Sequence, residues 1–437
     1  MYKVFFITFG CKVNQYETEC MKTAFKKSGY EVADVQEGAD IVVINSCTVT
    51  SSGDSRVISA LKRARKNSPF AVIALTGCYP QANGSEAEKL TEADIITGTK
   101  NRRELVSIVN EFIERRERKI TLEKYSADDI FENLESPSFD SNTRAFLKIQ
   151  DGCNQFCTYC IIPYARGRCR SRSPESIVAE VKKHAESGKK EIVLTGINLA
   201  FYGKEYGLNL ADAVEVCADV KGIERIRLGS LEPEVMSDDM IERLARVDKL
   251  CPHFHLSLQS GCDKTLKAMN RRYNSAEYLA LVEKIRKFFP ECSFTTDIMV
   301  GFPSETDEDF RESAEFVKKI GFSRVHVFRY SRRRGTVADR MAEQIPENIK
   351  TLRAEKMTET ARQTEEIYLR SLVGKTVEVL FERENCTDFH HGYSADYTVI
   401  KIPRENSEKS LRNKIFCVTI EESRPDFCIG RIADENI

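Results

Sequence analysis

A chain of 437 residues, 41% hydrophobic and 30% charged, has the composition of an ordinary globular protein and the length of about three domains. The net charge of −1 provides no overall attraction to nucleic acid, so any RNA contact requires local basic patches. No stretch resembles a membrane span, and the opening MYKVFFI is too short for a secretory signal. We therefore expect a cytoplasmic protein whose fifteen cysteines stay reduced.

Residues 1–115 are predicted to form a small parallel α/β domain. Four apolar runs, VFFITFG, DIVVINS, FAVIALTG and ADIITG, alternate with helical patterns. Three of these runs end alike, in TFGC, INSC and LTGC, which places Cys11, Cys47 and Cys78 just past a strand. Parallel strands end at one edge of a sheet, where ligands of α/β folds gather, so these cysteines are expected to converge on a metal cluster. Ordinary buried cysteines of βα turns are the alternative.

Residues 116–142 are polar and are expected to form a linker. Residues 143–370 contain six strand candidates, RAFLKIQ, EIVLTG, IERIRLGS, HFHLSL, SFTTDIMVG and SRVHVFRY, each followed by a helical pattern. This order predicts a partial, open (β/α)6 barrel with its active site at the C-terminal ends of the strands. Residues 371–437 change to β-rich runs between polar turns, which predicts a small antiparallel β-barrel.

The segment DGCNQFCTYC follows the first predicted barrel strand and contains Cys153, Cys157 and Cys160 with C-x3-C-x2-C spacing. Three thiolates can bind three irons of a four-iron cluster and leave the fourth iron open to a substrate or cofactor. A zinc site and an incidental group of cysteines are the alternatives. We favour the open cluster because of the spacing, the position at a strand end and the lack of a nearby fourth ligand.

This motif, with the aromatic Tyr159 before its last cysteine, resembles the signature of the radical S-adenosylmethionine (SAM) superfamily. The whole chain resembles the methylthiotransferases, which add an N-terminal three-cysteine domain and a C-terminal TRAM-type β-barrel. HLSLQSG at 255–261, MVGFPSET at 299–306 and YSRRRGTVA at 330–338 also match segments of that family in order. The resemblance implies two [4Fe-4S] clusters, one on each cysteine triad, and SAM as both methyl donor and radical source.

Known members of that family modify isopentenyladenosine in tRNA, threonylcarbamoyladenosine in tRNA, or an aspartate of a ribosomal protein. The opening TFGCKVNQYETE most resembles the threonylcarbamoyladenosine group. The implied reaction methylates a sulfur held at the first triad, forms a radical at the second, and transfers the methylthio group to C2 of the adenine next to the anticodon. The implied partners are tRNA, an electron donor protein and a sulfur source. The other two substrates remain alternatives, as does a noncatalytic iron–sulfur or RNA-binding protein.

Further candidate residues come from strand ends and basic clusters. The resemblance implies SAM contacts at Tyr159, Gly196, Asn198, Gln259, Gly301 and Pro303, although strand-end residues also form plain turns or helix caps. Asp297 lies in an apolar strand and needs a partner, either a ligand or a structural group.

Basic side chains near the barrel mouth and in the last domain are candidates for contacts with the anticodon loop. Arginines alternate at 166, 168, 170 and 172, and Arg332, Arg333 and Arg334 follow the sixth strand. Residues 371–437 carry nine basic against twelve acidic residues, so RNA contact there requires a local basic face. The candidates for that face are Arg412, Lys414 and Arg424.

Overall fold

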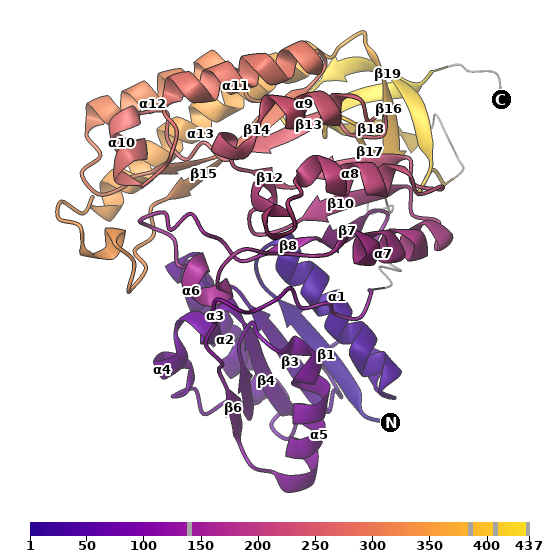
Figure 1. Cartoon of the computed structure of the whole chain (residues 1–437), viewed down its shortest axis with the longest axis vertical. Helices are drawn as coiled ribbons and strands as arrows, with labels where there is room; N and C mark the ends of the chain where they lie inside the picture. Colours follow the sequence, from indigo (N-terminus) through magenta and orange to yellow (C-terminus); the bar gives the residue numbers. More distant parts are fainter. Residues whose placement is uncertain (138–141, 383–387, 405–409, 434–437) are drawn as a thin grey trace.

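A computed structural model describes residues 1–137, 142–382, 388–404 and 410–433 of the protein. Figure 1 shows an α/β domain at the bottom, a partial barrel above it and a small yellow β-barrel at the C-terminal end. Among the described residues, no helix has both the length and the apolar composition needed to cross a bilayer.

The first domain is a six-stranded sheet in which all neighbouring strands are parallel. Its order is β2 (Glu31–Ala33), β1 (Lys3–Thr8), β3 (Ile41–Ser46), β4 (Val72–Gly77), β5 (Ile95–Thr97) and β6 (Lys119–Thr121). The strands β3 and β4 are buried along their whole length, because helices cover both faces of the sheet. One face packs on α1 (Lys12–Lys27) and α5 (Leu105–Arg115), and the other on α2 (Ser51–Asn67), α3 (Cys78–Ala82) and α4 (Gly84–Ala87).

Two strands of this sheet were not predicted. The strands β2 and β6 are three residues long, too short to produce a recognisable alternation of apolar and polar residues. The strand β6 lies at the start of the stretch 116–142, which was expected to be a linker, and pairs with β5. This part of the stretch therefore completes the first sheet.

The central region contains all six predicted strands in a parallel arrangement. One sheet has the order β11 (Arg225–Leu228), β10 (Glu191–Thr195) and β7 (Ala145–Lys148). The other has the order β12 (Ser230–Leu231), β13 (His253–Leu256), β14 (Ser293–Val300) and β15 (Arg324–Arg329). Only Gly229 separates β11 from β12, so this third predicted strand passes from one sheet to the other. The result is an open partial barrel.

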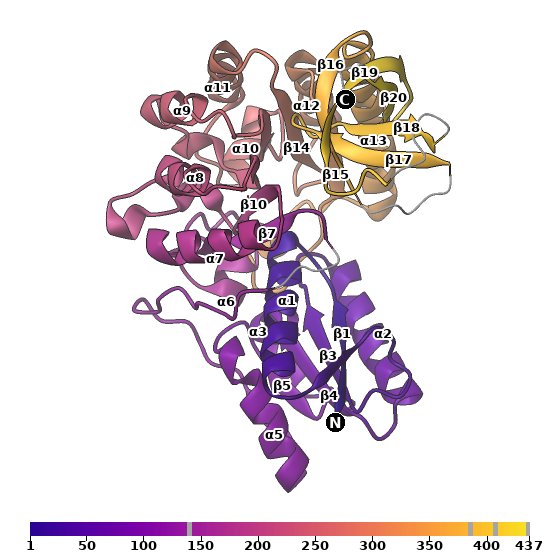
Figure 2. The ribbon, with the colours of Figure 1, turned by 90° about the vertical axis from the view of Figure 1, so that its right-hand side faces the viewer.

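Helices surround the outside of this barrel (Figures 1 and 2). They are α7 (Pro174–Glu186), α8 (Leu210–Ala218), α9 (Asp238–Ala245), α10 (Asp263–Ala268), α11 (Ser275–Phe288), α12 (Asp307–Ile320) and α13 (Glu347–Arg370). The hairpin β8 (Gln150–Asp151) and β9 (Arg170–Ser171) and the short helix α6 (Ile162–Arg166) flank the second cysteine motif. Short 3-10 helices cover Arg102–Glu104, Leu199–Phe201, Lys204–Tyr206, Pro233–Val235 and Ala338–Arg340.

The C-terminal domain is a closed five-stranded barrel. Its order is β16 (Thr376–Phe381), β17 (Phe389–Ser394), β18 (Val399–Pro403), β20 (Cys428–Ile432) and β19 (Ile415–Ser423). All neighbours are antiparallel except β18 and β20, which are parallel. The expectation of a purely antiparallel barrel is corrected at this pair, because five strands cannot alternate in direction around a closed ring.

The turn between β17 and β18 inserts beneath the partial barrel. Arg227 of β11 donates hydrogen bonds to the carbonyl oxygens of Ser394 (3.1 Å) and Ala395 (2.9 Å) in this turn. Ser293, at the start of β14, donates to the carbonyl oxygen of Asp396 at 2.5 Å. The C-terminal domain therefore closes the N-terminal end of the partial barrel, opposite the end where the predicted site lies.

Candidate active site

The first cysteine triad lies at one edge of the first sheet. Cys11 directly precedes α1, Cys47 follows β3, and Cys78 is the first residue of α3. Gly10 (φ +104°) and Gly77 (φ +101°) allow the three loops to approach one another. A Cβ atom at Gly10 would lie 2.7 Å from the Cβ atom of Cys47, and one at Gly77 would lie 2.5 Å from the backbone oxygen of Ser46, the residue before Cys47. The structure therefore brings these loops together, as the strand pattern predicted.

The thiols of this triad influence one another. Burial raises the pKa of Cys78 to about 11; Arg166 opposes that rise, whereas Cys47 and Cys11 add to it. Burial also raises the pKa of Cys47. Thiols with raised pKa values stay protonated in water at neutral pH and lose their protons when they bind a metal. The chemistry of this triad therefore fits a metal cluster.

A buried arginine connects this triad to the second cysteine motif. Arg166, at the end of α6, places its Nε atom 3.3 Å from the Cys78 sulfur. Its two terminal nitrogens donate to the carboxylate of Glu17 (2.9 and 3.0 Å), and one of them also donates to Asn14 Oδ1 at 2.7 Å. Arg166 is fully buried, so it cannot belong to an RNA-binding patch.

The acidic partners of Arg166 have further cationic neighbours. Glu17 also pairs with Lys148 (2.7 Å) and Arg102 (2.9 Å). Asp151 of β8 pairs with Lys148 at 2.6 Å, with Arg166 at 3.1 Å and with Arg170 at 3.6 Å. Four cations therefore surround two carboxylates. This network was not predicted, because it is completed by Glu17 and Arg102, which reach it only when the first domain packs on the barrel.

The second triad lies in the loop between β8 and α6. The Cys153 sulfur accepts hydrogen bonds from the backbone N–H of Gln155 at 3.4 Å and from Asn198 Nδ2 at 3.6 Å. Arg271 Nη1 donates to the Cys157 sulfur at 3.3 Å. Burial raises the pKa of Cys153 to about 12 and also raises that of Cys160. Donors directed at the sulfurs stabilise thiolates, so the loop fits an iron–sulfur cluster.

Arg271 belongs to a group that sequence reasoning missed. Its guanidinium forms an ion pair with Glu232, and its Nε donates to Tyr273 Oη at 3.1 Å. Burial raises the pKa of Glu232 to about 7 although Arg271 opposes that shift. The only sequence signal was the basic pair in MNRRYN, which does not distinguish a buried arginine from an exposed one.

The predicted SAM contacts are only partly grouped around this loop. The Oε1 atom of Gln150 accepts from the Asn198 backbone N–H at 2.7 Å, and a Cβ atom at Gly196 would lie 2.9 Å from it. Asn198 and Gln155 are buried, and the Asn198 Oδ1 atom and both amide atoms of Gln155 have no hydrogen-bond partner among the described residues. Orphaned polar atoms beside the cysteines fit a polar ligand.

Tyr159 packs edge-on against Phe302 of the GFPSET turn, with ring centroids 6.5 Å apart. Gln259 has a left-handed backbone (φ +67°) and donates its N–H to the carbonyl oxygen of Asp297 at 2.8 Å. Gly301 faces α13 instead, since a Cβ atom there would lie 2.4 Å from the Lys350 Cγ atom. Gly301 and the neighbouring Pro303 therefore shape a turn behind Tyr159.

Two neighbouring cavities lie beside the triads. The larger, of about 580 Å³, has Cys11 and Gly196 in its lining. The smaller, of about 180 Å³, is lined in part by Cys160, Tyr159 and Gln259 and by residues 49–50 of the Cys47 loop. Asp297 and Phe328 line both cavities. The two cavities therefore adjoin, with a cysteine of the first triad in one lining and a cysteine of the second triad in the other.

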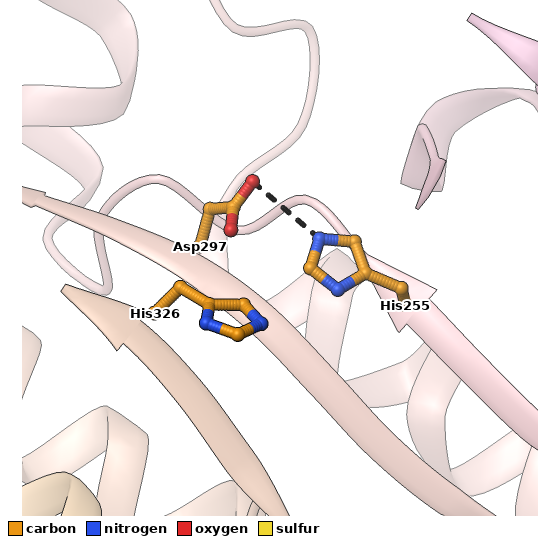
Figure 3. A group of neighbouring side chains, drawn as sticks. All are labelled: His255, Asp297 and His326. Atoms are coloured by element: carbon orange, nitrogen blue, oxygen red, sulfur yellow. Dashed lines mark ion pairs between the residues drawn. The ribbon is translucent and has the colours of Figure 1, made fainter. Parts of the chain in front are cut away.

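A polar cluster lies in the wall of the larger cavity (Figure 3). His255, Asp297 and His326 project from β13, β14 and β15, and one ligand atom of each lies within 4.8 Å of the others. His255 Nε2 is 3.4 Å from Asp297 Oδ2, and His255 Nδ1 is 2.9 Å from Thr295 Oγ1. His255 is thus the partner that Asp297 required. The three side chains have the donor types of a metal site or of a hydrogen-bonding site for a polar ligand.

The candidate RNA contacts differ in their surroundings. Arg332 and Arg334 are exposed (61% and 88%), and Arg332 pairs with Asp339 at 2.7 Å. Arg333 requires a correction: it is buried and contacts Asp54 (2.6 Å) and Thr48 (2.7 Å) of the first domain, so it joins two domains.

In the last domain, Arg412 and Lys414 are exposed, and Arg424 pairs with Glu422 at 3.0 Å. Within the alternating arginine run, Arg170 and Arg172 are buried, like Arg166. Buried arginines in ion pairs are not available to phosphates, so most of that run is structural.

Comparison with known proteins supports this architecture. The family described as "Radical SAM superfamily" matches residues 147–317, and the one described as "Uncharacterized protein family UPF0004" matches residues 3–98. The structure resembles the radical SAM methyltransferase TsrM from Kitasatospora setae, with a TM-score of 0.55, 14% identity and coverage of 75% of each chain. It also resembles the cobalamin-dependent radical enzyme OxsB, with a TM-score of 0.53, 12% identity and coverage of 83% of this chain and 56% of that chain. At these identities the likeness concerns the fold alone.

Closer relatives are found by sequence. A threonylcarbamoyladenosine tRNA methylthiotransferase of Aquifex aeolicus is 40% identical over 88% of this chain and 93% of its own. The Bacillus subtilis protein of the same name is 39% identical over 91% and 89%. A tRNA-2-methylthio-N(6)-dimethylallyladenosine synthase of Clostridium botulinum is 38% identical over 88% and 87%. Given this identity over most of both chains, the protein belongs to the radical SAM methylthiotransferase family.

Proposed function

We propose that the protein converts threonylcarbamoyladenosine, next to the anticodon of tRNA, into its 2-methylthio derivative. The observation that carries this proposal is the pair of adjoining cavities: Cys11 lines one, Cys160 lines the other, and Asp297 lines both. A base placed there lies between the two triads. The names of the Aquifex aeolicus and Bacillus subtilis relatives support this substrate, and that of the Clostridium botulinum relative supports the dimethylallyl alternative.

We assign one [4Fe-4S] cluster to Cys153, Cys157 and Cys160 and a second to Cys11, Cys47 and Cys78. Each triad offers three thiols, and cationic or N–H donors contact the sulfurs, as thiolate ligands require. The Oδ1 atom of Asn198, which has no hydrogen-bond partner among the described residues, offers an acceptor to SAM beside Cys153. When bound, the clusters and SAM supply the one-electron cleavage that yields a carbon radical and the sulfur that is methylated and transferred.

The protein's own residues orient these groups and exclude water. Arg271 fixes the Cys157 side chain, and Arg166 fixes that of Cys78. The larger cavity, at about 580 Å³, is in the size range of small-molecule sites and suits a single extruded nucleoside. An anticodon-loop base is unpaired, so it can enter such a cavity without the cost of breaking a base pair.

Contacts outside the cavity position the RNA. Ser331 lines the smaller cavity, and the exposed Arg332 and Arg334 follow it directly, so they are placed to contact phosphates of the loop. Arg412, Lys414 and Arg424 offer a second, peripheral basic face. An electron donor protein and a sulfur source complete the set of partners, and we place the reaction in the cytoplasm, where tRNA is found.

The test is anaerobic turnover of the reconstituted protein with SAM and a reductant on tRNA carrying threonylcarbamoyladenosine. Mass analysis of the digested nucleosides should show a methylthio gain that Cys157→Ala and Cys47→Ala abolish. Cys292→Ala is the matched control, because Cys292 belongs to neither triad, and it should retain the gain. SAM cleavage without a gain on this nucleoside, but with a gain on dimethylallyladenosine, would favour the alternative substrate.

A further inference from the structure

Lys12, a cation in the larger cavity, forms no ion pair with any residue that the structure describes. Lys12 follows Cys11 in α1, is partly buried and lines the cavity. Within the described part of the chain its ammonium group forms no ion pair or hydrogen bond. The ammonium group lies 5.6 Å from the centroid of the Tyr397 ring. A partly desolvated charge without a partner is unfavourable unless a ligand supplies the partner.

The other charged groups that line this cavity already have an ionic or a hydrogen-bonding partner. Arg324 pairs with Glu365 at 3.0 Å, and Asp297 pairs with His255 at 3.4 Å. Asp396 accepts hydrogen bonds from Tyr368 at 2.5 Å and from Thr398 at 2.7 Å. Of the lysine and arginine side chains described in this lining, Lys12 is therefore the one without an anionic partner, and it can bind an anion.

Polar side chains of the same wall also have unused hydrogen-bonding atoms. His253 is 4% exposed, and its Nδ1 atom has no hydrogen-bond partner among the described residues. The Nε2 atom of His255 likewise has no hydrogen-bond partner among them, and its contact with Asp297 is long, at 3.4 Å. His255, Asp297 and His326 face one another at the cavity wall (Figure 3). The wall therefore offers both donors and acceptors to a polar ligand.

We propose that Lys12 binds the carboxylate of the threonyl group of the substrate, and that the His255–Asp297–His326 cluster contacts the hydroxyl and ureido groups of the same substituent. This inference rests on the proposed function, and it makes Lys12 a specificity-determining residue. A dimethylallyl group has no polar atom, so it would leave Lys12 and the cluster desolvated and unpaired. Sites built for polar groups reject analogues that lack them far more strongly than apolar sites reject polar ones.

The experiment compares two anticodon stem-loop RNAs, one with threonylcarbamoyladenosine and one in which the carboxylate is replaced by the uncharged carboxamide. Dissociation constants are measured by fluorescence anisotropy with the anaerobic holoenzyme and SAM, without reductant. The wild-type protein should bind the acid roughly ten-fold to a hundred-fold more tightly than the amide, the range expected for a charge-assisted hydrogen bond. Lys12→Met should remove this preference by weakening only the acid, and Lys12→Arg should retain part of it.

Lys26→Met is the matched control, because it removes the same charge from an exposed position of the same helix and should preserve the acid-to-amide ratio. Iron content is measured for each variant because Lys12 adjoins Cys11. Equal binding of acid and amide by the wild-type protein would overturn the inference without need of a variant, and so would a full preference in Lys12→Met. A wild-type enzyme that modifies only dimethylallyladenosine would instead refute the proposed function.

Discussion

Replacement of Glu17 by glutamine is expected to loosen the contact between the first domain and the barrel. The Glu17 carboxylate is fully buried, and burial alone would raise its pKa. Arg102, Arg166 and Lys148 overcome that effect and hold the pKa at about 2, below the ordinary value of 4.5. At about 1.36 kcal/mol per pKa unit, the difference stabilises the folded protein by about 3 kcal/mol, which the uncharged glutamine would lose.

The assay is urea unfolding of Glu17→Gln and of wild-type protein. The midpoint is measured for the transition in which the first domain separates from the barrel. Glu111→Gln is the control, because Glu111 is 37% exposed and its pairs with Lys119 and Arg115 lie at the surface. That change should alter the free energy of unfolding by less than about 0.5 kcal/mol. A Glu17→Gln midpoint equal to that of the control would refute the reasoning.

The pH dependence gives a second check on the same side chain. Because the folded-state pKa of Glu17 is depressed, its contribution is complete above pH 4.5 and disappears as the pH falls towards 2. The stability difference between wild type and Glu17→Gln should therefore shrink across that window. A difference that stays constant down to pH 2 would show that the charge of Glu17 is not the source of the stabilisation.

Three further changes test the site. Gly10→Ala should reduce the iron bound at the first triad and leave the iron at the second triad intact, because the new Cβ atom would lie 2.7 Å from the Cβ atom of Cys47. The control for iron content is Gly29→Ala, because Gly29 also has a positive φ but a Cβ atom there would meet nothing within 4 Å. Asn198→Ala should raise the Kd of SAM roughly five-fold to a hundred-fold, as expected for a lost hydrogen bond to a charged ligand. The measurement is equilibrium binding of SAM to the unreduced holoenzyme, and an unchanged Kd would mean that Asn198 contacts only Cys153. Arg334→Ala should weaken tRNA binding and reduce by about one the salt dependence of the binding constant, and an unchanged slope would remove this arginine from the RNA interface.

The sequence predicted the parts of the site that depend on local patterns. The positions of Cys11, Cys47 and Cys78 follow from strands that end at one edge of a parallel sheet, and the structure brings their loops together. The six barrel strands were also predicted from a local pattern, because each is an apolar run followed by a helical stretch. Local order in the chain was sufficient in both cases.

Residues whose environment is set by contacts between domains could not be predicted in this way. Arg166 and Arg333 occur in basic runs that read as exposed patches, yet both are buried against the first domain. In the sequence Lys12 is only one letter of the motif TFGCKVNQYETE, because its surroundings are formed by the barrel wall and by the turn around Tyr397. The residues next to Arg166, Arg333 and Lys12 in the sequence do not indicate these contacts.

The buried network around Arg166 also explains how the two cysteine triads keep a fixed separation. Arg166 ends the helix that begins two residues after Cys160, and its side chain contacts the sulfur of Cys78. The network has four cations and two carboxylates, so it retains two positive charges that neighbouring thiolates can balance. A metal that deprotonates the thiols of the first triad would therefore strengthen the contact between the domains. Assembly of that site and docking of the first domain on the barrel should then stabilise each other.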